Sequence, residues 1–387
     1  MKVLVNGVPL LSPLTGIGQY IRHLFTAMDQ LQLAEVCVHY GLRIEKGLHL
    51  PCERTAQTLT RVNGLAQRFV PYPRTARRLV EKALFAYQTR FALQDALYHE
   101  PNYVPMPFDG PLVLTICDMS CFDHPDTHPI ERVRLMQREM PRALDRADHI
   151  VVISESSGHA LQRWFDIPSE KITTTYLAAD ARFRPHNPAE LVVPLAELKL
   201  VAGSYILCVG TLEPRKNLTT LFTAFAGLPA ALRQRYPLVV AGMSGWNTQQ
   251  LMQSAQVLID KGELRLLGYV PDALIPPLYA GAAALCYPSR YEGFGLPALE
   301  AMASGVPVLT SNQTSLPEVV GDAGLMVNPD DVSAMRDSLQ LMLEDRVFAQ
   351  ALGTKGLARA QSFSWERCAR ETVDVYKQVM RSRGRAV

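Results

Sequence analysis

Short apolar runs alternate with amphipathic stretches over almost the whole length of this chain. Several of the runs are apolar on both faces, which is typical of parallel β-strands covered by helices on each side. The predicted strands are residues 2–5, 35–40, 96–99, 112–116, 149–154, 205–209, 238–241, 265–267, 283–287, 306–310 and 324–327. Helical patterns between them include residues 18–31, 131–146, 218–225 and 332–343. This alternation predicts an α/β fold with two doubly wound parallel sheets.

One break in the alternation divides the chain into two domains. Residues 184–203 are rich in proline and polar groups, and a new βα series opens at Ser204. We therefore predict an N-terminal Rossmann-like domain over 1–183, a linker over 184–203, a second Rossmann-like domain over 204–364, and a helical segment over 365–387. Ligands of such folds bind at the carboxyl ends of the strands.

Composition and charge narrow the functional classes. The 387 residues are 48% hydrophobic, which is ample for two cores, and the net charge of +2 favours no nucleic-acid partner. No apolar stretch approaches the roughly 20 residues that span a bilayer, and no signal peptide precedes the first strand. Seven scattered cysteines indicate reduced, buried thiols in a cytoplasmic protein that is soluble or peripheral. Cys117, Cys121 and His124 have no second ligand cluster, so we expect no metal site.

The stretch from 290 to 300 carries the strongest chemical signal. It follows an apolar run and leads into strong helix-forming sequence, so strand, glycine-bearing loop and helix occur in that order. Gly293 and Gly295 allow the backbone to approach a ligand, and the free N–H groups at the helix start favour a phosphate. Glu292 and Glu300 flank this loop, where their carboxylates can accept hydrogen bonds from hydroxyl groups.

This spacing of two glutamates resembles the donor-site signature of retaining family-4 glycosyltransferases, which have the GT-B fold. Three further segments resemble motifs of that family in the same order, and they cover nearly the whole chain: residues 15–20, 209–217 and 268–272. Within that family, the chain resembles bacterial mannosyl- and D-rhamnosyltransferases that build O-antigen or other surface polysaccharide. The resemblance implies two Rossmann-like domains facing across a cleft, with the final helix crossing back to the N-terminal domain.

The resemblance also implies a role for each donor-site residue. Glu300 is expected to accept hydrogen bonds from the ribose hydroxyls, and Glu292 from hydroxyls of the transferred sugar. Other residues are expected to contact the donor at its diphosphate, in the base pocket or at the helix start. They are Gly16, Gly18, Thr211, Val270, Gly293, Phe294, Gly295 and Leu296. No carboxylate is clearly placed as a nucleophile, so attack on the face that the phosphate leaves is favoured.

Breaking the anomeric bond of a nucleotide sugar puts negative charge on the departing phosphate, which a metal or fixed cations must stabilise. The chain has no Asp-x-Asp pair to hold a metal, but it has Arg215 and Lys216 just after a strand. Arginine can grip two phosphate oxygens and lysine supplies a mobile point charge. We therefore expect Arg215, Lys216 and Glu292 to be catalytic, with no metal and no cofactor besides the GDP-linked substrate.

Cys117 departs from the family pattern. The family commonly has His-Asp-Leu where this chain has Cys117-Asp118-Met119, and that histidine lies beside the transferred sugar. A thiol is a weak hydrogen-bonding group, so the change would cost little if the sugar were 6-deoxy. Nearby His99 could take over some of the polar role, and simple drift to a small apolar residue is the alternative.

Residues 61–90 are strongly basic, with seven Lys and Arg against one acid, and bulky apolar residues are interleaved among them. Such a segment suits an anionic membrane surface, although a solvated helix with a buried stripe has the same pattern. The resemblance favours membrane contact, because acceptors of that family are often lipid-linked.

The sequence therefore predicts a retaining, metal-independent hexosyltransferase that moves mannose or D-rhamnose from a GDP-sugar to a lipopolysaccharide or polysaccharide acceptor. A UDP-sugar donor and a non-catalytic nucleotide-sugar-binding protein are the alternatives within this fold. A dinucleotide-dependent oxidoreductase is disfavoured, because Gly16-Ile17-Gly18-Gln19-Tyr20-Ile21 lacks the third glycine of the dinucleotide fingerprint.

Overall fold

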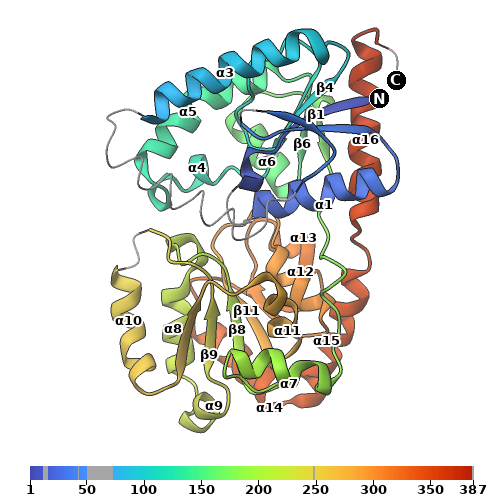
Figure 1. The fold of residues 1–387 in the computed structure, drawn as a ribbon. Helices are drawn as coiled ribbons and strands as arrows, with labels where there is room; N and C mark the ends of the chain where they lie inside the picture. Colours follow the sequence, from blue (N-terminus) through green and yellow to red (C-terminus); the bar gives the residue numbers. More distant parts are fainter. Residues whose placement is uncertain (12–15, 42, 50–72, 247–248, 386–387) are drawn as a thin grey trace. The chain divides into compact units, whose positions relative to one another are not determined.

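The computed structural model describes residues 1–11, 16–41, 43–49, 73–246 and 249–385. These residues divide into two units, each with its own sheet of mostly parallel strands (Figure 1). Unit 1 comprises Met1–Phe122, Glu131–Leu177 and Trp365–Val387, and unit 2 comprises Asp123–Ile130 and Ala178–Ser364.

The sheet of unit 1 has seven strands in the order β3-β2-β1-β4-β5-β6-β7. The strands are β1 (Lys2–Asn6), β2 (Glu35–His39), β3 (Ile44–Lys46), β4 (Leu97–Glu100), β5 (Leu112–Ile116), β6 (His149–Val152) and β7 (Ile172–Thr174). Every neighbouring pair is parallel except β2 and β3. All residues of β4, β5 and β6 are buried, as the two-sided apolar pattern predicts.

The helices of unit 1 are α1 (Gly16–Gln30), α3 (Pro73–Ala92), α4 (Ser120–Asp123), α5 (Ile130–Arg146), α6 (Glu155–Trp164) and α16 (Trp365–Ser382). Helix α16, the last of the chain, packs against α1 and against strands β5 and β6 (Figure 1). Its buried side includes Trp365, Cys368 and Tyr376. The final helix therefore completes the core of unit 1 and not that of the unit preceding it in sequence.

The sheet of unit 2 has six parallel strands in the order β10-β9-β8-β11-β12-β13. They are β8 (Ile206–Val209), β9 (Leu238–Ala241), β10 (Leu264–Gly268), β11 (Ala284–Tyr287), β12 (Val308–Ser311) and β13 (Leu325–Val327). The order reverses direction between β8 and β11, and the loops that follow β8, β9 and β11 emerge at one edge of the sheet. This is the topological switch point at which open α/β sheets bind ligands.

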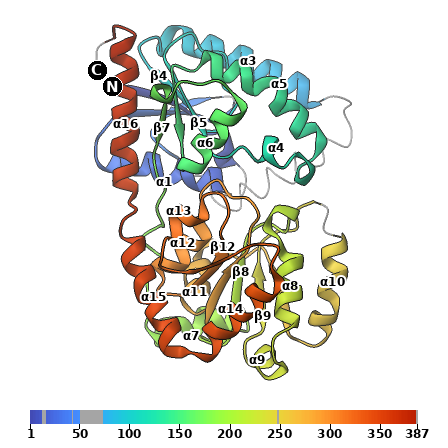
Figure 2. The same cartoon turned by 180° about the vertical axis from the view of Figure 1, so that it is seen from behind.

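The helices of unit 2 are α7 (Pro188–Glu197), α8 (Leu218–Ala226), α9 (Ala230–Arg235), α10 (Gln249–Asp260), α11 (Ile275–Ala280), α12 (Leu296–Ala303), α13 (Leu316–Val320), α14 (Val332–Glu344) and α15 (Arg346–Ala360). Helix α8 packs beside α10 and α14, whereas α12 packs beside α11, α13 and α15. Figure 2 shows the two groups on opposite sides of the sheet. The prediction of two doubly wound sheets is confirmed.

Two short strands escaped the sequence pattern. Strands β3 and β7 each have three residues that are half-buried or exposed, so they leave no apolar run. Strand β3 is also the only antiparallel member of the sheet among the described residues. Both lie at sheet edges, where hydrophobic patterning is weakest. None of the described helices is both long and apolar enough to span a membrane.

The domain boundaries differ from the prediction in three places, the smallest being residues 178–183, which belong to unit 2 and not to the N-terminal domain. Residues 184–203 are not a linker, because they contain α7 and belong to unit 2. Asn187 N donates to Glu190 Oε2 at 2.8 Å at the start of this helix, and Leu191 and Leu195 are buried beside α11. Residues 123–130, predicted within the N-terminal domain, pack with unit 2. Pro185, Pro188 and Pro194 made residues 184–203 resemble a connection.

Candidate active site

The loop after β8 is held in one conformation by its glycine and its asparagine. Gly210 has φ +147°, and a Cβ there would approach the Lys216 side chain at 3.2 Å. The buried amide of Asn217 donates to the carbonyls of Pro288 at 3.2 Å and Pro329 at 2.7 Å. Arg290 N donates to Arg215 O at 2.9 Å, so the loops after β8 and β11 are joined through their backbones as well.

Arg215, Lys216 and Glu292 form one connected network at this edge of the sheet. Arg215 Nη1 donates to Glu292 Oε2 at 3.2 Å and to Tyr291 O at 2.8 Å. Lys216 Nζ donates to Glu292 Oε1 at 2.7 Å and to Tyr287 Oη at 2.7 Å. The Tyr287 hydroxyl itself donates to Glu292 Oε1 at 2.7 Å. The structure therefore brings together the three residues predicted to be catalytic.

A second carboxylate balances the charge of the network. Arg215 Nη2 lies 2.6 Å from Glu213 Oε1, and the Glu213 side chain is only 6% exposed. The network thus holds two cations and two carboxylates. The sequence predicts no role for Glu213, because a glutamate in a basic loop has no distinctive pattern.

The protonation state of Glu292 follows from its surroundings. Burial alone would raise the pKa of this carboxyl, but Lys216 and Arg215 overcome it and lower the pKa to about 2. Glu292 is therefore ionised at neutral pH. A carboxylate in this state accepts hydrogen bonds and cannot donate one.

The turn into α12 requires its glycine. Gly295 has φ +109°, and a Cβ there would meet Leu316 Cδ2 at 2.7 Å. The Ser315 hydroxyl fixes the loop by donating to the carbonyls of Glu292 at 3.0 Å and Phe294 at 2.8 Å. The same loop is held from its other side, where Glu292 N donates to Thr314 Oγ1 at 3.0 Å. Gly293, Phe294, Gly295 and Leu296 thus lead into the helix beside the charged network.

Glu300 lies on α12 itself, one turn beyond the start of this helix, and other charged groups surround it. The side chain is half-buried, and burial raises the pKa of its carboxyl to about 7 despite the nearby Tyr279 hydroxyl and Arg182. Arg182 bridges two carboxylates, Asp180 at 3.0 Å and Asp272 at 2.8 Å. Asp272 is two residues after the buried Val270, and its charge acts on Glu300. The segment expected to line a base pocket therefore lies in the same part of unit 2 as Glu300.

Of the four remaining predicted residues, Thr211 lies in the loop after β8, whereas Gly16, Gly18 and Cys117 belong to unit 1. Gly16 is exposed at the start of α1, and Gly18 is buried two residues later. Cys117 follows β5 and is 8% exposed, with its Sγ 4.0 Å from the carbonyl of Pro101. Burial, with the neighbouring Asp118, raises the pKa of the Cys117 thiol, so this side chain is neutral.

The expectation that His99 could replace a polar sugar contact is wrong. The ring is fully buried in unit 1, and burial lowers its pKa to about 3. His99 Nδ1 contacts Tyr376 Oη at 2.5 Å and its Nε2 contacts Thr115 Oγ1 at 2.7 Å. One nitrogen attaches α16 to the sheet and the other contacts the neighbouring strand β5, so His99 has a structural role.

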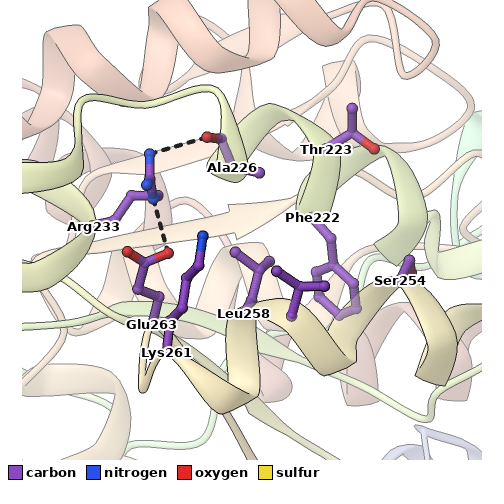
Figure 3. Close-up of a pocket in the computed structure, with 9 residues that line it drawn as sticks. Phe222, Thr223, Ala226, Arg233, Ser254, Leu258, Lys261 and Glu263 are labelled. Carbon is purple, nitrogen blue, oxygen red and sulfur yellow. Dashed lines mark hydrogen bonds and ion pairs between the residues drawn. The ribbon is translucent and has the colours of Figure 1, made fainter.

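A cavity of about 270 Å³ between α8 and α10 contains none of the predicted residues (Figure 3). Within it Arg233 Nε lies 2.9 Å from Glu263 Oε2, and Arg233 also donates to the carbonyl of Ala226 at 3.0 Å. Figure 3 shows the aliphatic side chain of Leu258 beside this ion pair. The pair satisfies a buried carboxylate, so the cavity is structural.

No group of three or more His, Cys, Asp or Glu side chains among residues 1–11, 16–41, 43–49, 73–246 and 249–385 is arranged to hold a metal ion. The network at Glu292 contains two carboxylates, but each is already bound to a cation of the protein. The residues that this site presents to an anionic ligand are therefore the two cations themselves.

Comparison with known proteins places these features in a family. Residues 198–359 match the family described as "Glycosyl transferases group 1". The O-antigen chain mannosyltransferase B of Escherichia coli is 38% identical over 384 residues, which cover 97% of this chain and 100% of that protein.

Solved structures share the fold at lower identity. Sucrose-phosphate synthase from Thermosynechococcus elongatus has a TM-score of 0.76 and 20% identity, over 99% of this chain and 100% of that one. The Anabaena protein HepE, solved with UDP and glucose, has a TM-score of 0.73 and 18% identity, over 98% and 100%. The predicted GT-B fold is confirmed by these likenesses.

Proposed function

Because this chain belongs to the group 1 glycosyl transferases, we propose that it transfers mannose, or its 6-deoxy form D-rhamnose, from a GDP-sugar to a growing polysaccharide, with retention of configuration. The observation that carries the proposal is the network of Arg215, Lys216 and Glu292 at the switch point of unit 2. The full-length similarity to an O-antigen mannosyltransferase supports the choice of sugar and of acceptor class.

Arg215 and Lys216 stabilise the departing phosphate in this proposal. Both side chains are largely buried, at 15% and 12% exposure, so their charges act with little screening by water. Both are already oriented by Glu292, which reduces the reorganisation needed when negative charge develops. These two cations supply the charge that a metal supplies elsewhere, and we propose that transfer needs no divalent ion.

Glu292 holds the transferred sugar and does not act as the general base that removes the proton of the acceptor hydroxyl. A general base must have a pKa near the working pH, and that of Glu292 is about 2. Its ionised carboxylate suits hydrogen bonds from sugar hydroxyls. The proton of the acceptor hydroxyl then passes to the departing phosphate as the acceptor attacks on the same face, which retains the configuration.

In this proposal, the remaining parts of the donor bind to the other site residues that the sequence predicts. Glu300 accepts hydrogen bonds from the ribose, and Val270 contacts the base. The backbone from Gly293 to Leu296 faces the phosphates or the sugar, with Thr211 beside them. Gly16 and Gly18 cover the diphosphate, and Cys117 faces carbon 6 of the sugar. The positive end of α12 supports an anion near its first turn.

We further propose that the acceptor is lipid-linked and that the protein works in the cytoplasm against a membrane surface. The basic segment 61–90 motivates this. Residues 61–72 lie outside the described part of the chain, and 73–90 belong to α3. Tyr87 is 68% exposed and Arg90 is exposed on that helix. Sedimentation with vesicles containing phosphatidylglycerol, but not with phosphatidylcholine vesicles, is the expected result.

A UDP-sugar donor is the second candidate, favoured by the likeness of the fold to a protein solved with UDP. Calorimetry with GDP-, UDP-, ADP- and TDP-sugars distinguishes the two, and we expect the GDP-sugars to bind most tightly. Binding of GDP-mannose without transfer to any mannosyl acceptor would instead indicate a non-catalytic nucleotide-sugar-binding protein.

A further inference from the structure

Residues 123–130 lie across the loops that carry the candidate site, although the sequence assigns them to the other half of the chain. They belong to unit 2, while Phe122 before them and Glu131 after them belong to unit 1. Inside the segment, the His124 carbonyl accepts hydrogen bonds from Thr127 N at 3.1 Å and Thr127 Oγ1 at 2.7 Å. The segment is therefore a closed turn with a defined shape.

Two contacts attach this turn to opposite sides of the site. The His124 ring packs edge-on against Tyr291, with centroids 5.2 Å apart and planes at 70°. At the other end, Trp246 Nε1 donates to Thr127 O, and the His128 ring lies 6.0 Å from the Trp246 ring. Tyr291 is in the loop after β11 and Trp246 in the loop after β9.

The loop with Arg215 and Lys216 lies between those two attachments. Strand β8 is flanked by β9 and β11, and hydrogen bonds join the loops that follow these three strands. Leu212 N donates to Met243 O at 2.9 Å and Gly245 N donates to Leu212 O at 3.0 Å on one side. On the other side Tyr291 O accepts from Arg215 Nη1 at 2.8 Å. The turn 123–130 thus spans the β8 loop from one neighbour to the other.

His124 is the member of the turn with open hydrogen-bonding capacity. Its side chain is half-buried, and its ring makes a packing contact but no hydrogen bond to the part of the chain that the structure describes. An imidazole can donate from one nitrogen and accept at the other. Sugar hydroxyls require partners of this kind in a site that excludes water.

We propose that His124 is a further residue of the transfer site, and that its imidazole hydrogen-bonds a hydroxyl of the donor sugar or of the acceptor sugar. The inference rests on the proposed function, because it takes the Arg215 loop as the place of transfer. The packing on Tyr291 sets the position of the ring, and Tyr291 in turn contacts Arg215. His124 therefore binds sugar beside the group that stabilises the departing phosphate.

His124→Phe tests this, since phenylalanine keeps the aromatic packing on Tyr291 but has no ring nitrogen. With GDP-mannose and a mannosyl oligosaccharide on a hydrophobic aglycone, we expect kcat/KM to fall about 10- to 100-fold with unchanged thermal unfolding. His159→Phe, at an exposed histidine of α6, is the matched control and should leave kcat/KM unchanged.

The KM that changes in His124→Phe shows whether the contacted hydroxyl belongs to the donor or to the acceptor. A rise confined to the oligosaccharide assigns the contact to the acceptor, and a rise confined to GDP-mannose assigns it to the donor. A sugar that lacks the contacted hydroxyl should then give the same kcat/KM with the wild type and with His124→Phe. Equal kcat/KM for wild type and His124→Phe would overturn the proposal.

A binding measurement keeps the test independent of turnover. The imidazole nitrogen signals of His124, assigned by comparison with His124→Phe, should shift when GDP-mannose or the oligosaccharide is added. If the wild type transfers neither mannose nor D-rhamnose from the GDP-sugars, the proposed function fails, and these signals still decide on His124. Signals that stay unchanged with both ligands would contradict its place in the site.

Discussion

Replacing Lys216 by methionine removes one charge from the network while keeping a side chain of similar length. In the wild type, Lys216 Nζ donates to Glu292 Oε1 and to Tyr287 Oη, both at 2.7 Å. Without it, Glu292 keeps the hydroxyl of Tyr287 and one contact to Arg215 at 3.2 Å. A carboxylate that is 8% exposed then has only one cation beside it.

The expected magnitudes follow from the pKa of Glu292. A decrease from 4.5 to about 2 corresponds to about 3 kcal/mol in favour of the ionised form. Because Arg215 still stabilises the Glu292 carboxylate in the variant, only part of this free energy is lost. We expect the free energy of unfolding at pH 7 to decrease by about 2 kcal/mol. This stabilisation is present above the pKa of an unfolded glutamate and is lost as the pH falls toward about 2. Turnover should decrease more, by about 3 kcal/mol or roughly a hundredfold.

The assay measures kcat with GDP-mannose and, in parallel, the denaturant midpoint of unfolding. Lys261→Met, at an exposed lysine beside the cavity between α8 and α10, serves as the control and should change neither quantity. Adding Glu292→Gln to Lys216→Met should restore stability, since no unpaired carboxylate remains, but not turnover. A kcat of Lys216→Met within about threefold of wild type would refute the role of Lys216.

Three more predictions concern the metal, the pH dependence and the sugar. Transfer should continue in EDTA at the wild-type rate, because Arg215 and Lys216 supply the positive charge; loss of activity restored by magnesium or manganese would contradict this. The Kd of GDP-mannose should rise as the pH falls through about 7, where Glu300 gains a proton and loses acceptor capacity, and Glu300→Gln should remove this dependence, as calorimetry can check. Wild type should prefer GDP-D-rhamnose to GDP-mannose by roughly one to two orders of magnitude in kcat/KM, and Cys117→His should narrow or reverse that ratio; an unchanged ratio would refute the assignment of Cys117 to carbon 6.

The two sheets and the charged network could be predicted because their signals are local. Buried parallel strands leave apolar runs, and the segments with Arg215 and Glu292 each follow such a run directly. Parallel strands that are neighbours bring the loops after them to one edge, so the meeting of these side chains follows from topology. The partners Tyr287 and Glu213 were missed because a tyrosine within a strand and an acid in a turn have no distinctive pattern.

Tertiary packing explains the remaining errors. Helix α7 was taken for a linker because its stretch has several prolines, yet the apolar side chains of Leu191 and Leu195 pack against α11. His99 was taken for a possible sugar contact because its expected place near Cys117 would let it replace the polar role of the family histidine. Its bonds to Thr115 and to Tyr376, the latter 277 residues away, depend on the final helix and cannot be seen in local sequence.

The configuration of the product tests the central claim most directly. The protein is incubated in EDTA with GDP-α-D-mannose and a mannosyl oligosaccharide, and the new anomeric centre is identified from its one-bond carbon–proton coupling. The account predicts an α-linked mannose, because the acceptor attacks on the face that the phosphate leaves beside Arg215 and Lys216. A β-linked product, or no product until a divalent metal is added, would contradict it.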